Sequence, residues 1–323
     1  MTRATVLIPT HDHGHLLRHA TETVLVQSVS DIEVFVVLDG ADDTTRAVAQ
    51  ELALGDDRVR IFEFPKGERH GEAHRHLVLG EATGRIVCYH SDDDLWFSDH
   101  IEYMEGLLEH ADFANTLAVT IRPNGEIENP VGDLGLPYYR QRLLDHISIN
   151  FVGLLNAGHT LDMYRTRGHA WEPAPPGVPT DLFMWRRFFS DPSVRLKSGG
   201  RPTALHFAST HRQGMPLEAR LEELARWHRK LLDPQWQAGF RLEFFEFLSR
   251  KRAERAAELE PERDRLEHAL EVSARDWKAS QDALAAMALE NTKLDAALAA
   301  SAEHWRQAQE TIAGVHRKLE DGR

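Results

Sequence analysis

Short apolar runs alternate with amphipathic helical patterns over the first 110 residues of the chain. The clearest strand covers residues 32–38, which are nearly continuous in apolar and β-branched side chains, as expected for a strand buried on both faces. Alternation of this kind is typical of βαβ units and a mostly parallel sheet. The predicted strands are residues 5–8, 32–38, 59–64 and 85–89, and the predicted helices are residues 15–27, 42–52, 72–81 and 98–108.

The pattern becomes less regular after residue 110. Asn124-Gly125 separates two short β-rich runs, and this pair accepts the positive φ that a tight hairpin turn requires. Further helices are predicted at residues 137–146, 181–190, 216–232 and 235–248, and further strands at residues 118–122, 126–128, 194–196 and 203–207. We expect an α/β domain over residues 1–215, followed by a helical extension over residues 216–250.

The last part of the chain, residues 251–323, is rich in Ala, Glu, Arg and Leu and has no strand pattern. Mostly apolar residues recur every seven positions from Leu270 onward, and a weaker series begins at Leu266; these series fit positions a and d of a coiled coil. Asn291 occupies an a position, which favours one register and a dimer. We expect a C-terminal coiled coil that makes the protein a homo-oligomer. A single solvated helix or helical disorder is the alternative.

The charge balance is acidic, with 38 Lys and Arg against 51 Asp and Glu, a net charge of −13. This argues against non-specific binding of nucleic acid. The single cysteine, Cys88, excludes a disulfide framework and a Cys-based zinc site. No apolar run reaches the ~18–20 residues of a transmembrane helix, so we expect a cytoplasmic protein, at most peripheral at the inner face of the membrane. The nineteen histidines show no H-E-x-x-H spacing, and they predict no zinc site.

Polar residues follow the predicted strands, at the sheet edge where ligands bind in doubly wound folds. They are Pro9-Thr10, Asp39-Gly40 and Ser91-Asp92-Asp93-Asp94, together with Arg75 in the third helix. Three aspartates behind a buried strand repel one another, and a Mg²⁺ or Mn²⁺ ion would relieve this repulsion; a solvated loop or helix cap is the alternative. No strand is followed by a P-loop or a G-x-G-x-x-G motif, which argues against P-loop kinases and Rossmann dehydrogenases.

As a set, these motifs resemble glycosyltransferase family 2. The resemblance covers residues 5–10, 36–44, 75–84 and 91–96, and residues 179–186 resemble the acidic base motif of the family. It implies a Rossmann-like α/β domain of the GT-A fold. It also implies inverting, metal-dependent transfer from a nucleotide-sugar, most commonly a UDP-sugar.

The resemblance also implies roles for individual residues. Pro9, Thr10 and Asp39 would contact the nucleotide, and Arg75 would lie beside its base or diphosphate. Asp93 and Asp94 would hold Mn²⁺ or Mg²⁺, supported by Asp92 on the donor side. Asp181 would be the catalytic base. Of the two histidines after the last predicted strand, His206 and His211, we choose His211 with Arg212 for a diphosphate or metal contact. His159 and Trp171 would line the acceptor site. Departures from the family pattern stand at Leu38, His76, Ser91 and Thr180.

We therefore expect a glycosyltransferase that moves a sugar to a hydroxyl group of a cell-surface polysaccharide or glycan precursor. In this chemistry a carboxylate removes the proton of the acceptor hydroxyl while its oxygen attacks the anomeric carbon. A sugar nucleotidyltransferase is one alternative, although the first loop lacks the expected basic residue. A catalytically degenerate scaffold that assembles partners through its coiled coil is the other.

Overall fold

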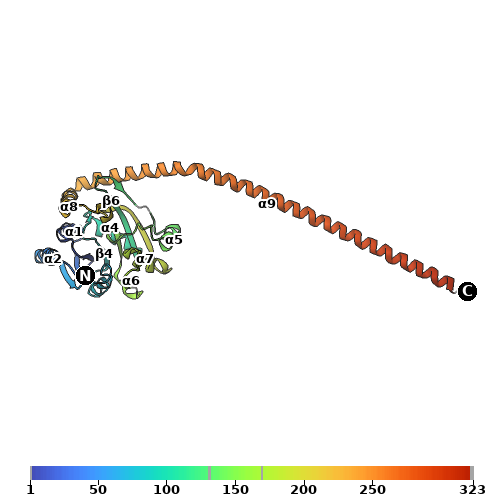
Figure 1. Cartoon of the computed structure of the whole chain (residues 1–323), viewed down its shortest axis with the longest axis horizontal. Helices are drawn as coiled ribbons and strands as arrows, with labels where there is room; N and C mark the ends of the chain where they lie inside the picture. The colour runs from blue at the N-terminus through green and yellow to red at the C-terminus, as the bar shows by residue number, and fades with distance from the viewer. Residues whose placement is uncertain (1, 130–131, 169, 321–323) are drawn as a thin grey trace. The chain divides into compact units, whose positions relative to one another are not determined.

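A computed structural model describes residues 2–129, 132–168 and 170–320, with only the backbone for residues 308 and 311–320. The chain divides into two compact units between Leu242 and Glu243. The first unit is an α/β domain built on one sheet, and the second consists of a single helical segment (Figure 1).

Four parallel strands form one half of the sheet and confirm the predicted βαβ pattern. Their order is β3-β2-β1-β4, and they are β1 (Ala4–Thr10), β2 (Ile32–Asp39), β3 (Val59–Phe64) and β4 (Ile86–Tyr89). The intervening helices are α1 (Gly14–Leu25), α2 (Asp43–Gly55) and α3 (Glu72–Leu79). Asp42 caps α2, because its side chain accepts a hydrogen bond from the Thr45 amide at 2.7 Å.

The other half of the sheet is mixed, so the expectation of a mostly parallel sheet holds for the first half alone. β8 (Ala157–Thr160) runs antiparallel to both β4 and β6, and β6 pairs in parallel with β9. These strands are β5 (Leu95–Trp96), β6 (Phe113–Ile121), β7 (Ile127–Glu128), β8 and β9 (Leu196–His206). The predicted hairpin is β6–β7, with Gly125 at a φ of 85°. β9 is one strand where two short ones were predicted.

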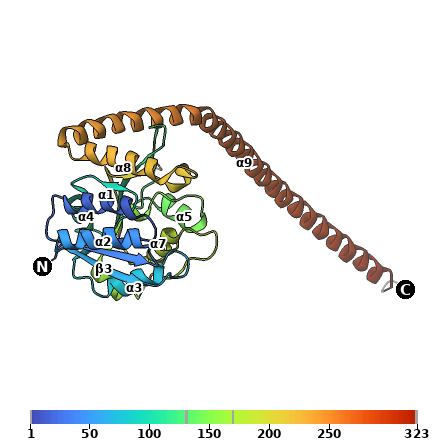
Figure 2. The same cartoon turned by 60° about the vertical axis from the view of Figure 1, so that its left-hand side comes forward.

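Each face of the sheet covers its own hydrophobic cluster, because successive side chains of a strand point to opposite faces. Val6 and Ile8 of β1 belong to the cluster beneath α1, α2 and α4 (His100–Leu108), whereas Leu7 belongs to the other. Figure 2 shows α1 and α2 on one side of the sheet and α3 on the other. The second cluster also holds residues of the three remaining short helices, α5 (Pro137–Asp145), α6 (Leu161–Thr166) and α7 (Thr180–Ser190).

The predicted helical extension is part of the first unit. α8 (Leu217–Leu231) packs against α1, and Trp227 on α8 contacts Phe207 with a ring separation of 6.2 Å. The first turns of α9 (Pro234–Glu320) return to the same helix, since Phe240 lies 6.1 Å from Trp227. The boundary between the two compact units falls inside α9, between Leu242 and Glu243.

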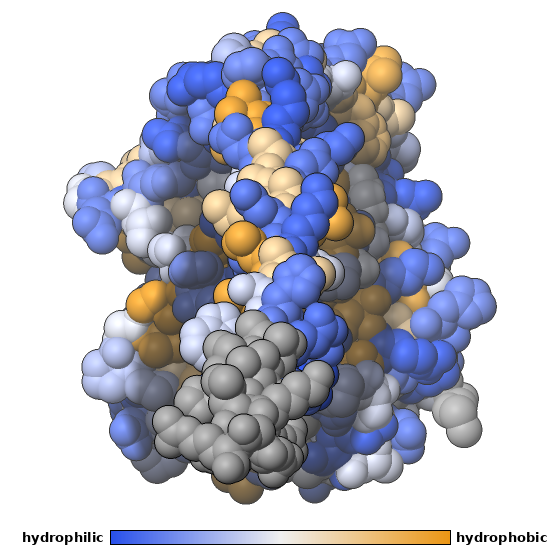
Figure 3. Space-filling model, turned by 90° about the vertical axis from the view of Figure 1, so that its right-hand side faces the viewer, coloured by the Kyte–Doolittle hydropathy of each residue, from blue (hydrophilic) through white to orange (hydrophobic). Residues whose placement is uncertain are grey.

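The second unit is the remainder of α9, and its helix carries the predicted heptad residues on its surface. These side chains expose 56–71% of their area: Leu266, Leu270, Trp277, Leu284, Met287, Leu294, Leu298 and Trp305. Positions 308, 312, 315 and 319 of the two heptad series lie outside the described side chains. Figure 3 shows apolar and hydrophilic side chains intermingled along this helix. Among the described residues, no helix is both long enough and apolar enough to span a bilayer.

Candidate active site

The turn after β4, Ser91-Asp92-Asp93-Asp94, is called the acidic turn here; Asp92 and Asp94 in it are buried at the carboxyl end of the parallel strands. Asp94 is 1% exposed and accepts a hydrogen bond from the Phe207 amide at 2.7 Å. Burial raises the pKa of Asp94 to about 7. Asp94 thus faces the end of β9, and it ties this strand to the acidic turn.

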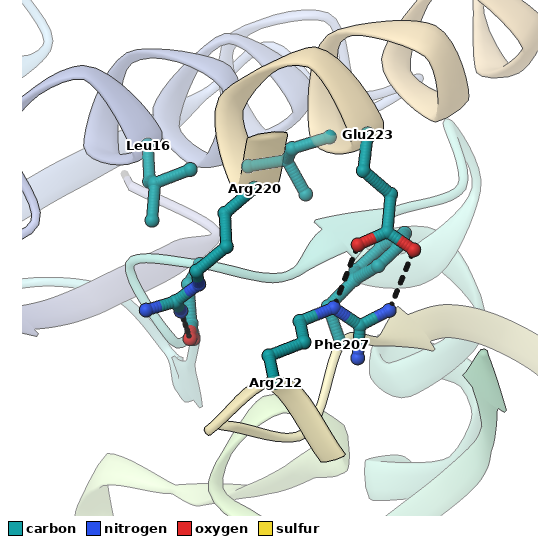
Figure 4. A pocket seen from close by; sticks show the side chains of 7 residues that line it. Leu16, Phe207, Arg212, Arg220 and Glu223 are labelled. Atoms are coloured by element: carbon teal, nitrogen blue, oxygen red, sulfur yellow. Dashed lines mark hydrogen bonds and ion pairs between the residues drawn. The ribbon is translucent and has the colours of Figure 1, made fainter. Parts of the chain in front are cut away.

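Asp93 is held by groups from outside the turn. One of its carboxylate oxygens, Oδ2, accepts from Arg220 Nη2 at 2.7 Å and from Ser209 Oγ at 3.1 Å; the bond to Arg220 is drawn in Figure 4. Burial and the neighbouring carboxylates of Asp94 and Asp92 raise the pKa of Asp93 to about 7. The arrangement favours a proton or a cation at this point, as expected for like charges crowded in a buried site.

His13 joins the acidic turn from the loop before α1. Its Nδ1 atom lies 2.8 Å from Asp92 Oδ1, and this hydrogen bond raises the pKa of His13 to about 9. His13, Asp92 and Asp93 each offer a ligand atom, and these atoms lie within 4.8 Å of one another. His13 was not among the residues predicted for the site, although its position four residues after Pro9 places it at the same sheet edge. The predicted partner of Asp93 was Asp94, which is not part of this group.

Asp39 ends β2 and is surrounded by donors. Its carboxylate accepts from Lys66 Nζ at 2.6 Å and from the Gly67 amide at 2.6 Å. Gly71 packs so closely that a Cβ there would lie 2.6 Å from Asp39 Cγ, and its φ is 68°. Lys66 was not predicted from the sequence. Thr10 ends β1 directly after Pro9, and its hydroxyl is buried with no hydrogen-bond partner among the described residues.

Arg75 of α3 is buried, and its guanidinium group lies over an aromatic ring. Its Cζ atom is 4.8 Å from the centre of the Trp171 ring, and Nη2 donates to the His70 carbonyl at 3.1 Å. Its Nε atom has no partner within the described part of the chain. Burial lowers the pKa of Arg75, while the negative charges of Glu72 and Asp181 oppose this effect. The guanidinium thus retains a donor for an anion.

Asp181 lies in the first turn of α7, as the sequence predicted. One oxygen accepts from the Leu182 amide at 2.7 Å and the other from Asn150 Nδ2 at 3.2 Å. Burial raises the pKa of Asp181, and these hydrogen bonds and the charge of Arg75 oppose the shift. A carboxylate with a raised pKa is a better proton acceptor than an exposed one.

His206 directly precedes Phe207, whose amide donates to Asp94. It ends β9, and its Nδ1 atom lies 3.3 Å from Thr120 Oγ1. Burial lowers the pKa of His206, and the carboxylates of Asp93 and Asp181 both act against this shift. Both carboxylates thus act on the half-buried His206 imidazole, whereas the predicted choice was His211.

Arg212 and His211 lie at the edge of this site. Arg212 makes two hydrogen bonds to the Glu223 carboxylate, at 2.7 and 2.8 Å, and a third to the Ile121 carbonyl at 2.9 Å. His211 lies 3.9 Å from Glu128. Figure 4 shows Arg212 turned toward Glu223 and Arg220 turned the opposite way. Arg212 is thus bonded to α8 through Glu223. A small pocket is lined by Arg212 and Arg220 together with Leu16, Phe207 and Leu224.

His159 and Trp171, the predicted acceptor residues, lie in the core. His159 Nδ1 donates to the Thr160 carbonyl at 3.0 Å, so its Nε2 atom accepts from the Tyr89 hydroxyl at 2.8 Å. Trp171 Nε1 donates to the same hydroxyl at 3.0 Å. Burial lowers the pKa of His159 to about 4 and keeps it neutral. Neither side chain presents a face to an acceptor, because both are almost fully buried in this network.

Comparison with known proteins identifies similar chains. A family model described as glycosyl transferase family 2 matches residues 5–161. A GalNAc(5)-diNAcBac-PP-undecaprenol beta-1,3-glucosyltransferase of Campylobacter jejuni is 30% identical over 94 residues, which are 29% of this chain and 30% of that protein. The UDP-Glc:alpha-D-GlcNAc-diphosphoundecaprenol beta-1,3-glucosyltransferase WfgD of Escherichia coli is 26% identical over 99 residues, 30% of this chain and 37% of that protein. The match therefore spans about a third of the length of these relatives.

Solved structures with a similar fold include TarS of S. aureus. Its residues 1–349 in complex with UDP-GlcNAc give a TM-score of 0.53 at 12% identity, covering 70% of this chain and 65% of that one. The complex of the same protein with UDP gives a TM-score of 0.52 and covers 64% and 60% of the two chains. At this level of identity, the likeness concerns the fold.

Proposed function

From the premise that residues 5–161 belong to glycosyltransferase family 2 and that the globular unit has the GT-A fold, we propose that the protein transfers a sugar from a nucleotide-sugar to a hydroxyl acceptor. The observation that carries the proposal is the group formed by His13, Asp92 and Asp93, whose ligand atoms lie within 4.8 Å of one another behind β4. It supports a cation-binding site for the diphosphate of a nucleotide-sugar at this edge of the sheet.

We assign the nucleotide to the edge formed by the ends of β1 and β2. The Thr10 hydroxyl, which has no partner among the described residues, and the Asp39–Lys66 pair offer hydrogen-bonding groups to a base, and Pro9 precedes Thr10 at the end of β1. Arg75 is the cation for the diphosphate or the base, because its Nε atom is free within the described residues. UDP is the proposed nucleotide, since a TarS structure contains UDP and the name of WfgD specifies UDP-Glc.

A divalent cation, Mn²⁺ or Mg²⁺, is proposed for the acidic turn. Asp93, Asp92 and His13 fit such an ion, because two carboxylates and an imidazole lie close together there. Burial and, after it, the neighbouring carboxylates raise the pKa of Asp93, and a cation would relieve the crowding of charge. When bound, the ion would supply positive charge for the departing diphosphate. His13 must lose its proton, and Arg220 must share or release Asp93, before all three groups can serve as ligands.

Asp181 is the proposed catalytic base. The acceptor oxygen forms a bond to the anomeric carbon while the bond from that carbon to the diphosphate oxygen breaks, and the hydroxyl proton passes to the Asp181 carboxylate. The anomeric configuration inverts, because the attack comes from the face opposite the leaving group. The Asn150 amide and the first-turn position on α7 hold the carboxylate in place.

The proposed acceptor is a polyprenol-diphosphate-linked glycan precursor. This follows from the names of the two relatives above, both of which act on undecaprenol-diphosphate glycans. The proposed assembly is a homodimer through the heptad face of α9, because eight large apolar side chains at a and d positions are exposed there. A coiled coil would cover these side chains with those of a second copy.

A product assay tests the proposal. The full chain is incubated with UDP- or GDP-sugars, Mn²⁺ or Mg²⁺ and a lipid-diphosphate-linked sugar. We expect release of the nucleoside diphosphate and a longer glycan. Release of pyrophosphate would instead identify a nucleotidyltransferase, and the absence of both turnover and nucleotide binding would identify a scaffold.

A further inference from the structure

Two histidines and a glutamate meet between α1 and α8, outside the proposed catalytic site. His19 and Glu22 belong to α1, and His228 belongs to α8. His19 Nδ1 lies 3.1 Å from His228 Nδ1, and the Glu22 Oε2 atom lies 3.6 Å from the first and 3.5 Å from the second. This group shares no residue with the acidic turn, and the two histidines are 209 positions apart in the sequence.

The triangle of ligand atoms has the size of one face of a tetrahedral metal site. Zn²⁺ binds imidazole nitrogens at about 2.0–2.1 Å and carboxylate oxygens at about 2.0–2.2 Å, so ligand atoms at tetrahedral angles are about 3.3–3.5 Å apart. The observed edges of 3.1, 3.5 and 3.6 Å bracket this range. The three ligand atoms, two imidazole nitrogens and one carboxylate oxygen, all lie within 4.8 Å of one another, close enough to share one ion.

The surroundings of the group suit a bound ion. His228 is 8% exposed, and the side chains of His19 and Glu22 are 20% and 39% exposed to solvent. The site is therefore closed on the His228 side and open on the Glu22 side, where water could complete the coordination. A shared proton between the two imidazoles is the arrangement that the same contact allows without a metal.

We propose that His19, Glu22 and His228 bind a transition-metal ion, with Zn²⁺ as the best fit, and that this ion fixes α8 to α1. Imidazole and carboxylate ligands with a water in the fourth position are typical of Zn²⁺. Because ligands from two helices meet at the ion, its binding holds the helices at one separation.

An ion bound at His228 would also affect the acidic turn, because His228 and Arg220 belong to the same helix. Arg220, Leu224 and His228 are four residues apart along α8, so they lie on one face of that helix. Arg220 at one end of this face pairs with Asp93, and His228 at the other end meets α1. An ion at His228 would therefore hold Arg220 within reach of Asp93. This consequence stands on the geometry and needs no assumption about glycosyl transfer.

The test is metal binding by the full chain, measured in an Asp93→Asn background that disables the acidic turn. Zn²⁺ is titrated into chelator-treated protein by calorimetry, and the melting temperature is recorded alongside. We expect one equivalent of Zn²⁺ and a raised melting temperature. His228→Ala and Glu22→Gln in the same background should weaken binding by on the order of 10- to 100-fold. His15→Ala is the matched control, because His15 is an exposed histidine on the same helix as His19.

Three results would overturn the proposal. They are the absence of Zn²⁺ binding in the Asp93→Asn background, unchanged binding in Glu22→Gln, and equal loss of binding in His15→Ala. Should His228→Ala fail to fold, Glu22→Gln decides the question, since Glu22 is the most exposed of the three side chains. Co²⁺ provides a second readout, because ligation by the two imidazoles changes its visible absorption spectrum; an unchanged spectrum would show a hydrogen-bonded pair only.

Discussion

Arg220 of α8 pairs with Asp93 of the acidic turn at 2.7 Å, and both side chains are largely covered, with 16% and 13% of their area exposed. This contact places the positive charge of a guanidinium where the proposed cation would bind. Arg220 and Asp93 are 127 positions apart in the sequence, so this contact joins α8 to a distant part of the chain. The last helix before α9 therefore takes part in the electrostatics of the site.

Replacing Asp93 tests the proposed cation site directly. Asp93→Asn removes a ligand and one of three crowded carboxylates, so we expect kcat/KM for metal-dependent transfer to fall by at least about 100-fold while the protein still folds. The thermal shift produced by Mn²⁺ should disappear as well. Asp57→Asn, at an exposed position before β3, serves as the control. Wild-type turnover in Asp93→Asn would place the cation elsewhere.

Replacing Arg220 tests its competition with the cation. Arg220→Gln leaves Asp93 without its positive partner, so Mn²⁺ should bind about tenfold more tightly in the absence of nucleotide. Calorimetric titration measures this change, and Arg226→Gln, an exposed arginine of the same helix, is the control. Weaker Mn²⁺ binding in Arg220→Gln would contradict the competition and would show that Arg220 orients the carboxylate for the ion.

Replacing Asp181 separates donor binding from transfer. An amide cannot accept the acceptor proton, so Asp181→Asn should lower kcat by about 10²- to 10⁴-fold and leave the dissociation constant of the nucleotide-sugar nearly unchanged. Asp162→Asn is a matched control, because Asp162 is an exposed aspartate in the first turn of α6. Transfer at the wild-type rate in Asp181→Asn would mean that another group removes the proton.

The buried His159 predicts how stability changes in acid. Its pKa of about 4 lies below the value of about 6.5 in an unfolded chain, so the unfolded state binds the extra proton between these values. The contribution of neutral His159 is therefore complete above pH 6.5 and is lost as the pH falls toward 4. Between pH 7 and pH 4.5 we expect the wild type to lose about 2 kcal/mol more than His159→Gln in the free energy of unfolding. Denaturant titrations at the two pH values measure the difference, and equal losses would show that His159 is accessible to protons.

The strands that could be predicted from the sequence are those composed mainly of apolar, β-branched residues. β2 is buried at nearly every position, and its run of apolar, β-branched residues is visible without any partner. β8 was missed because Ala157-Gly158-His159-Thr160 has no such run. Its glycine is required by packing, since a Cβ at Gly158 would lie 2.9 Å from the Met104 side chain. The two glycines inside β9 concealed the continuity of that strand in the same way.

In the candidate site, too, some residues could be predicted from the local sequence and others could not. Asp39, Asp93 and Asp181 were predicted because each ends or follows a recognisable strand or stands in the first turn of a helix. Their partners could not be predicted, because each contact joins distant segments: Lys66 lies 27 residues from Asp39, and Arg220 lies 127 residues from Asp93. His159 and Trp171 were misplaced for a related reason, since polar ring atoms satisfied within the core look like site residues in a sequence.

The heptad face of α9 predicts a self-association that two substitutions should abolish. Leu284 and Leu298 occupy a positions and expose 64% and 68% of their area, so in a coiled coil both would be covered by a second copy. Leu284→Glu combined with Leu298→Glu places charges in that seam, and light scattering should report a monomer. Leu289→Glu is the matched control, because Leu289 is equally apolar, is 59% exposed and lies five positions after Leu284, outside the seam. Donor binding should be the same in all three proteins, since no residue of the proposed site lies on this segment. A double variant that keeps the mass of the wild-type assembly would show that the heptad face is not the contact between copies.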